Sequence, residues 1–325
     1  MKRRQMRRNL AITILTLTAV AIGLCTLVGC GSGEQTKLVH AWQLTTNDRY
    51  DSEPMRDPVV SWSPDSRSLV FTLVDGKTYK KNAMRWNVGE KTLTRVADGV
   101  SPNYVDNNTI LLFQANPISI LEKDLKTGKV HSIAPQLHQL DLWKDITSFS
   151  YNPARKSLEL RFSDFTRYYE SGCQEVDLSG KFVRNIPRAT GGGVLDRSMD
   201  PKGGRSAVIL GDLTGSVSEL RISKSGEDTK GISVATGQLG AVAWSPDGRF
   251  VAYSEDNTVN VCSPSGDNKI LVARFGKLPD SGDQPRVCRL VWSPDGNYLA
   301  AVELVPKDVW TFEMIYVLDM SKVGR

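Results

Sequence analysis

The sequence predicts an all-β fold, and three observations carry this prediction. A unit made of a short apolar strand, a tight polar turn and a returning apolar strand recurs six times along the chain. A second turn, centred on glycine, follows several copies and joins two further strands. The two ends of the chain carry incomplete pieces of the unit that complement each other. Repetition at this scale indicates similar small sheets arranged in a regular array.

The clearest copies of the unit contain the run Trp-Ser-Pro-Asp. It occurs at residues 62–65, 244–247 and 292–295, and an apolar strand follows each copy, at residues 68–71, 250–253 and 298–301. In such a turn Pro restricts φ, Asp accepts hydrogen bonds from the backbone two residues on, and a following Gly adopts positive φ. The Trp at the end of the first strand is placed to pack between neighbouring sheets.

Three weaker copies share the same frame, at residues 101–103, 151–153 and 199–201. The prolines of the six copies stand at positions 64, 102, 153, 201, 246 and 294, so the steps run from 38 to 51 residues. A period in the forties is typical of a four-stranded propeller blade. We therefore expect a six-bladed β-propeller, with a β-sandwich or a β-solenoid as alternatives.

The third and fourth strands of a blade are visible on either side of the glycine turns. Such turns occur at residues 126–128, 179–180 and 265–266. Each is preceded and followed by a short β-rich segment, for example residues 120–124 and 130–133 around the first turn. This pattern predicts that all four strands of a blade follow one another in the sequence.

The last blade predicts how the ring closes. It has strands at residues 287–292, 298–304 and 312–319, and then no fourth strand before the end of the sequence. Near the other end, residues 38–45 have the pattern of a fourth strand without a preceding three. Pairing of residues 38–45 with residues 312–319 removes two exposed sheet edges, so we expect it.

The repeats resemble those of the TolB-like propeller family, in which a Trp-Ser-Pro-Asp-Gly turn joins the first two strands of each blade. The resemblance covers nearly all of the chain after the first thirty residues, and it is strong in three blades and degenerate in three. WD-repeat propellers share the layout, but the blades here show no regular Trp-Asp ending. The repeats begin too early for a separate N-terminal α/β domain of the TolB kind, so a role equivalent to that of TolB is not expected.

The first 29 residues have the pattern of a lipoprotein signal peptide. A basic start is followed by an uncharged apolar run from Leu10 to Gly29, and Leu27-Val28-Gly29-Cys30 looks like a lipobox. We expect cleavage before Cys30, a diacylglycerol thioether on its sulfur, a flexible leader over residues 30–37 and the propeller over residues 38–325. The alternative is an uncleaved transmembrane anchor, because about twenty apolar residues can span a bilayer. The lipoprotein reading places the protein outside the cytoplasm, on a cell membrane or an outer membrane.

Charge and cysteine content restrict the possible partners. The net charge of +5 comes from five basic residues before Cys30, and the remaining basic and acidic residues are equal in number. A basic nucleic-acid surface is therefore not indicated. Cys173, Cys262 and Cys288 show neither a metal-binding spacing nor a disulfide framework, and we interpret them as structural thiols. A Cys262–Cys288 disulfide is the alternative.

A binding surface is predicted from the lengths of the connections. The turns between the first and second strands and between the third and fourth strands are short and lie at one end of the blades, here called the turn face. The remaining connections lie at the opposite end, the loop face, and they are longer and richer in aromatic and charged residues. Varied loops on a rigid scaffold commonly carry binding. The candidate residues are Tyr50, Tyr79, Trp143, Tyr168, Asp283, Arg286 and Trp310.

Catalysis has little support in the sequence. The chain has three His, no HExxH run and no Gly-x-Ser-x-Gly run, and no catalytic residue, metal ligand or cofactor is predicted. Asp65, Asp247 and Asp295 are interpreted as turn-capping residues. The expected function is a membrane-anchored binding or scaffold module for an envelope protein or an extracellular ligand. The alternative is a propeller enzyme, such as a metal-dependent lactonase or a glycan-active hydrolase, with its site in the central channel.

Overall fold

The fold is described from a computed structural model. It describes residues 35–50, 59–74, 80–115, 118–134, 137, 146–152, 155–162, 173–185, 194–211, 217–227, 230–276, 285–307 and 310–323.

 All of them belong to the compact unit Gly33–Arg325, which is described here by itself. Within these ranges, no helix has the length and apolar character needed to cross a membrane.

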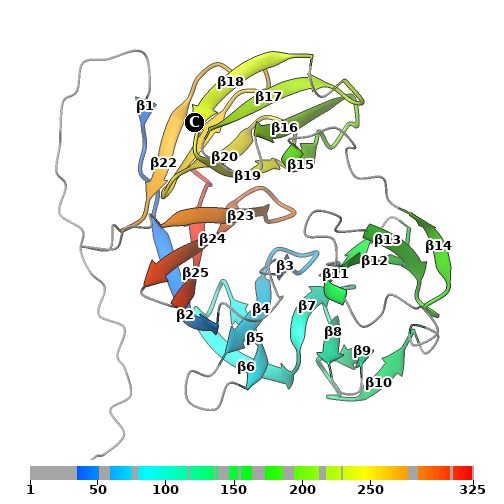
Figure 1. Cartoon of the computed structure of the whole chain (residues 1–325). Coiled ribbons are helices and arrows are strands. Elements are labelled where there is room, and N and C mark those ends of the chain that lie inside the picture. Colours follow the sequence, from blue (N-terminus) through cyan, green and yellow to red (C-terminus); the bar gives the residue numbers. More distant parts are fainter. Residues whose placement is uncertain are drawn as a thin grey trace, which may run out of the picture. The chain divides into compact units, whose positions relative to one another are not determined.

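The described residues form six sheets, five with four strands and one with five, and each sheet is one blade of a propeller (Figure 1). In blades 1 to 5 the four inner strands follow the order of the sequence. Blade 1 consists of β3 (Val60–Trp62), β4 (Ser68–Val74), β5 (Lys81–Asn87) and β6 (Thr92–Asp98). Blade 2 consists of β7 (Val100–Tyr104), β8 (Thr109–Ala115), β9 (Ile118–Asp124) and β10 (Val130–Ile133). Blade 3 consists of β11 (Ile146–Asn152), β12 (Ser157–Phe162), β13 (Cys173–Asp177) and β14 (Phe182–Asn185).

The other three blades repeat this plan, with additions from the N-terminal part of the chain. Blade 4 consists of β15 (Val194–Met199), β16 (Arg205–Gly211), β17 (Ser218–Lys224) and β18 (Ile232–Gly237). Blade 5 consists of β19 (Leu239–Trp244), β20 (Val251–Glu255), β21 (Thr258–Cys262) and β22 (Ile270–Arg274), with β1 (Gln35–Thr36) added at its outer edge. Blade 6 consists of β23 (Arg286–Trp292), β24 (Tyr298–Lys307), β25 (Trp310–Asp319) and β2 (Ala41–Tyr50). The predicted six-bladed propeller is confirmed.

Apolar side chains pack between neighbouring blades. Each of the five apolar clusters formed by described residues contains side chains from two adjacent blades. The cluster between blades 6 and 1, for example, brings Trp62 and Phe71 against Val302 and Val317. Burial of such side chains contributes about 1.5–3 kcal/mol each. The core therefore consists of the contacts between sheets.

The ring closes as the sequence predicted. β2 pairs antiparallel with β25, and Ala41 lies opposite Leu318 while Asp48 lies opposite Phe312. Trp42 of β2 packs between Trp86 and Tyr298, with ring centroids 5.9 and 6.2 Å away. One strand from the N-terminal part of the chain therefore completes blade 6 and contributes to its contact with blade 1.

The strand β1 was not predicted, and it lies within the stretch expected to be a leader. It pairs in parallel with β22, the outermost predicted strand of blade 5. The edge of β22 offers unpaired backbone groups, and a two-residue strand is enough to use some of them. The chain thus touches blade 5 before it enters blade 6.

The assignment of the first turn of blade 2 to Pro102 is wrong. Pro102 lies inside β7, and the turn follows Tyr104 instead. The Val105 N–H donates to the Thr109 carbonyl at 3.0 Å, and Asp106 Oδ1 accepts from the Asn108 N–H at 2.7 Å. An Asp-Asn-Asn turn therefore replaces Ser-Pro-Asp here, and buried Tyr104 stands where other blades have Trp.

Blades 5 and 6 approach each other closely at Gly240. A Cβ at this position would lie 2.2 Å from the backbone oxygen of Val287 in β23. Ser254 links the same two strands, β19 and β23. Its hydroxyl donates to the Val287 carbonyl at 2.8 Å and accepts from the Ala241 N–H at 2.8 Å. Only a residue without a side chain allows this contact between the two backbones.

Substitution of Gly240 by alanine is expected to separate these strands and to lower the free energy of unfolding by about 1–3 kcal/mol. The matched control is Gly204→Ala, because no atom lies within 4 Å of the Cβ position there. Urea unfolding followed by circular dichroism measures both variants. Equal stability of the Gly240 variant and the unsubstituted protein would contradict the close approach.

Candidate functional site

The structure places the short turns together on the turn face. The 1–2 turn of blade 4 contacts the 3–4 turn of blade 5, since Arg205 Nη1 donates to the Pro264 carbonyl at 3.3 Å. Adjacent 1–2 turns also touch: the Asp65 N–H donates to Asn107 Oδ1 and the Asp295 N–H donates to Ser66 Oγ, each at 3.0 Å. These contacts link the turns of neighbouring blades at the same end of the ring.

The Asp residues of the turn face cap their own turns. The hydroxyls of Ser63, Ser245 and Ser293 donate to the carboxylate two residues on at 2.6–2.7 Å. For Asp65, partial burial acts to raise the pKa, but the hydrogen bonds from Ser63 and from the Arg67 backbone outweigh it and hold the pKa below its usual value. The interpretation of these carboxylates as turn-capping residues is confirmed, and they are ionised acceptors rather than proton donors.

Four of the seven candidate residues for the loop face lie outside the described residues. They are Tyr79, Trp143, Tyr168 and Asp283. For Tyr50 and Trp310 the backbone is described, and Arg286 is described with an exposed side chain. The structure therefore places three of the seven candidate positions.

Those three positions lie at the loop-face end of blade 6. Tyr50 is the last residue of β2 and lies directly opposite Trp310, the first residue of β25. Trp310 in turn lies opposite Lys307 at the end of β24. Arg286 begins β23 and pairs with Leu304, three residues earlier on β24. Residues far apart in the sequence thus come together on one sheet.

Blade 6 is extended beyond its own inner strand at this end. The strands β2, β24 and β25 have 10 residues each, whereas β23 has 7. β23 begins opposite Leu304, so residues 305–307 of β24 pair only with β25. Three residues at about 3.3 Å each make a three-stranded extension of about 10 Å. Its backbone is paired as regular β-strand, so this end of blade 6 is part of the sheet and not a loop.

A buried acid lies next to the start of this extension. Glu303 on β24 is 1% exposed, and its Oε2 accepts from the Tyr316 hydroxyl at 3.1 Å. Its Oε1 has no hydrogen-bond partner among the described residues. Burial raises the pKa of Glu303 to about 7, against an ordinary value of 4.5, although the Tyr316 hydrogen bond acts to lower it. This carboxyl group therefore holds its proton up to near-neutral pH.

Glu303 was not among the predicted site residues, although the sequence carries a signal for it. It is the one charged residue in the apolar run from Leu299 to Val305. A strand that is apolar on both faces is buried on both sides, so a carboxyl group within it must also be buried. Perturbed acids of this kind are enriched at functional sites, and they also occur as structural groups.

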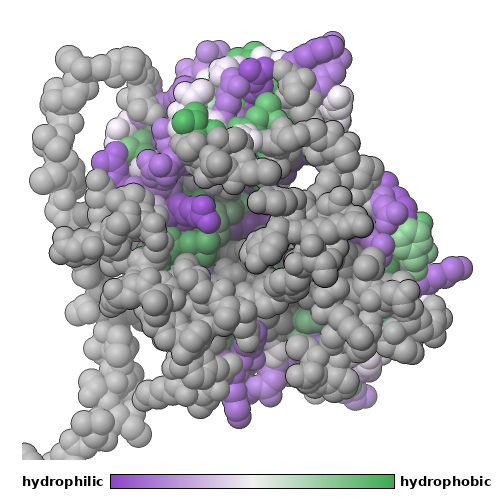
Figure 2. All heavy atoms as spheres, viewed as in Figure 1, coloured by the Kyte–Doolittle hydropathy of each residue, from purple (hydrophilic) through white to green (hydrophobic). Residues whose placement is uncertain are grey.

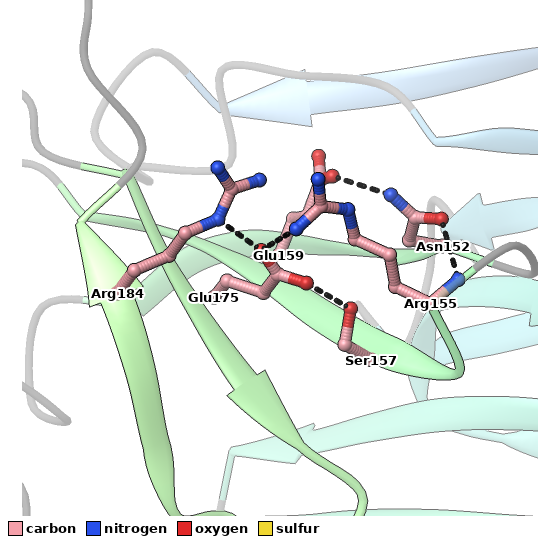
Figure 3. A network of polar contacts seen from close by, with 6 residues as sticks. All are labelled: Asn152, Arg155, Ser157, Glu159, Glu175 and Arg184. Atoms are coloured by element: carbon pink, nitrogen blue, oxygen red, sulfur yellow. Dashed lines mark hydrogen bonds and ion pairs between the residues drawn. The ribbon is translucent and has the colours of Figure 1, made fainter.

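A second buried acid, Glu175 on β13 of blade 3, is fully paired (Figure 3). Ser157 Oγ donates to its Oε1 at 2.6 Å and Arg184 Nε to its Oε2 at 2.5 Å, while Arg155 Nη1 lies 3.5 Å from Oε2. The hydrogen bond from Ser157 and that from Arg184 lower the pKa of Glu175. Both oxygens are engaged, so this group ties β12, β13 and β14 together and is not a free acid.

The coloured part of the face drawn in Figure 2 carries both polar and apolar side chains. Hydrophilic side chains cover much of the coloured area in Figure 2, and hydrophobic colour appears in separate patches. No group of three or more His, Cys, Asp or Glu side chains that could hold a metal ion is found within the described ranges. No disulfide joins Cys262 to Cys288, so that alternative is wrong, and burial raises the pKa of Cys262 to about 12.

The comparisons with known proteins agree with this architecture. The family model described as WD domain, G-beta repeat matches residues 230–263, which contain β18 to β21. No curated protein matches the sequence. An oligogalacturonate lyase in complex with manganese is similar in structure, with a TM-score of 0.55 and 10% identity over 88% of this chain and 95% of that chain.

Two further solved structures have lower scores. TolB from Acinetobacter baumannii has a TM-score of 0.44 and 16% identity over 65% of this chain, and the match spans about half of TolB, 52% of its chain. A gluconolactonase from Xanthomonas campestris has a TM-score of 0.49 and 12% identity over 85% of this chain and 89% of that chain. The chain is a β-propeller, and its Trp-Ser-Pro-Asp repeats resemble those of TolB-like propellers. At these identities, the similarity concerns the fold.

Proposed function

We propose that this protein is an extracytoplasmic lipoprotein, held at a membrane through Cys30, whose propeller binds an envelope protein or an extracellular ligand. The extended end of blade 6 carries the binding part of the proposal. It presents Tyr50 and Trp310 on paired strands, with Arg286 on the innermost strand of the same sheet. Aromatic and arginine side chains on a rigid support are the residue types that dominate protein interfaces.

The anchor is supported by the sequence around Cys30. The basic start, the apolar run and the Leu-Val-Gly-Cys motif are the parts that a lipoprotein signal requires. Two or three acyl chains bury many methylene groups, at about 0.8 kcal/mol each, and hold a protein stably at a membrane surface.

Replacement of Cys30 by serine is expected to move the protein from the membrane fraction to the soluble fraction. The hydroxyl group does not replace the thiol as the acceptor of diacylglycerol, so the N-terminus keeps no acyl chain. Intact mass spectrometry of the unsubstituted protein should show a diacylglyceryl adduct on an N-terminal Cys30. An unmodified Cys30 in the mature protein would contradict the anchor.

The binding surface is tested by photo-crosslinking in the native cell. A benzophenone amino acid at position 310 is expected to capture a partner that the same probe at Lys202, an exposed residue of the turn face, does not capture. The double variant Tyr50→Ala, Trp310→Ala should reduce recovery of that partner at least about tenfold. Lys202→Ala is the matched control. Unchanged recovery with the double variant would refute this surface.

The enzyme alternative stays a hypothesis. It requires several Asp, Glu or His side chains converging near the axis of the ring, with or without a metal ion. Its simplest test is the metal content of the purified full-length protein after dialysis. A stoichiometric divalent ion would favour the alternative over a binding module.

A further inference from the structure

The chain reaches the propeller at a defined place on blade 5. Gln35 lies opposite Ile270, and its N–H donates to the Lys269 carbonyl at 3.1 Å. The Lys37 N–H donates to the Leu271 carbonyl at 2.9 Å, and the Lys37 ammonium group donates to the carbonyl of Lys322. Residues 35–37 are therefore held along the outer edge of β22 by their backbone.

The direction of this pairing identifies the face from which the chain enters. β22 begins directly after the turn of residues 263–269, which belongs to the turn face. Because β1 runs parallel to β22 and in register with its start, the chain before Gln35 leaves the sheet at the turn face. The start of β2 lies at the same end, since the Asp319 N–H donates to the His40 carbonyl at 2.9 Å.

The length of the leader limits how far the anchor can be from this point. Cys30 precedes Gln35 by five residues. Five residues span at most about 18 Å even when fully extended. The ten residues of β25 span about 33 Å from the turn face to the far end of blade 6. The anchor can therefore stay close to the turn face, and the candidate binding surface lies at the opposite end of the strands.

We infer that the lipidated protein sits with the turn face of blades 5 and 6 toward the bilayer and displays its loop face away from it. This inference rests on the proposed acylation of Cys30, which holds that residue at the lipid headgroups. In this orientation the turn face of blades 5 and 6 contacts the lipid headgroups of the anchoring membrane. Leu38, which is 63% exposed, and the exposed Lys322 lie beside the entry point and are the first side chains to meet it.

Lipid photo-crosslinking of the full-length, membrane-bound protein tests this orientation. A benzophenone amino acid is placed singly at Lys322 on the turn face, at Gln43 on the outer edge of β2, and at Trp310 on the loop face. Phospholipid adducts are counted by mass spectrometry. Because the leader is short, adducts at Lys322 are expected to exceed those at Trp310 roughly fivefold or more, with Gln43 between them.

A longer leader supplies the matched control. Insertion of about 20 Gly and Ser residues after Gly33 adds roughly 25 Å of flexible reach, so the difference between Lys322 and Trp310 should shrink. Equal or higher adduct yields at Trp310 or at Gln43, with Cys30 acylated by mass spectrometry, would overturn the orientation and leave the anchor intact. An unmodified Cys30 would overturn both the anchor and the orientation.

Discussion

Replacement of Trp292 by alanine is expected to lower the free energy of unfolding by about 3–5 kcal/mol. Trp292 is 8% exposed and belongs to the apolar cluster between blades 5 and 6. Its indole N–H also donates to the Ala243 carbonyl of blade 5 at 3.1 Å. The alanine variant loses the packing of a large aromatic ring and leaves a carbonyl group without this donor. Guanidinium unfolding monitored by circular dichroism gives the difference.

Trp292→Phe separates the two contributions. The phenyl ring retains much of the packing and lacks only the N–H donor, so this variant should lose about 1–3 kcal/mol. Leu93→Ala on the outer strand of blade 1 is the control, because Leu93 is 39% exposed and should cost little. A loss below about 1 kcal/mol for the alanine variant would show that the ring does not depend on this contact.

Trp62 makes the equivalent contact between blade 1 and blade 6. Its indole N–H donates to the Val291 carbonyl of blade 6 at 3.0 Å. Trp244 differs, since its Nε1 has no partner among the described residues and the Arg205 guanidinium lies 5.1 Å from the ring centroid instead. The Trp of the repeated turn is thus both a packing residue and, in two blades, a donor to the preceding blade.

The sequence predicted the fold well because the repeated unit has a local physical cause. Ser and Asp two residues apart close the turn by themselves, so Trp-Ser-Pro-Asp marks the same turn at Asp65, Asp247 and Asp295. The closing strand was also predictable. The last blade lacks a fourth strand, and residues 38–45 have the pattern of a fourth strand without the other three, so pairing of the two was expected. The first turn of blade 2 was wrongly assigned to Pro102, because a Pro indicates a turn only when it lies outside a strand.

The candidate site was harder to predict, because it depends on contacts between distant segments. Nothing in the order of residues pairs Tyr50 with Trp310; only closure of the ring does so. Strand β1 has no pattern of its own, since two residues of backbone pairing require no particular side chains. Glu303 had a sequence signal, but its single partner, Tyr316, appears only when β24 and β25 are in register.

Substitution of Glu303 by glutamine is expected to stabilise the protein at pH 8 by up to about 3 kcal/mol. The folded protein holds the Glu303 proton up to about pH 7, whereas the unfolded chain releases it near the ordinary value of 4.5. Between these values the folded state binds more protons than the unfolded state, so its stability falls as the pH rises. Below both values neither state is charged at this position, and the cost disappears.

The pH dependence of this gain identifies Glu303 as its source. Glutamine keeps an oxygen that can accept from the Tyr316 hydroxyl and carries no charge, so the gain should fall below about 1 kcal/mol at pH 5. Glu227→Gln, at an exposed turn residue, is the control and should change stability little at either pH. Tyr316→Phe removes the hydrogen bond that lowers the pKa of Glu303, so stability should continue to fall with pH above 7. If Glu303→Gln instead destabilised the protein at pH 8, the carboxylate would have to be ionised and paired in the folded state, and the buried acid beneath the extension of blade 6 would be ruled out.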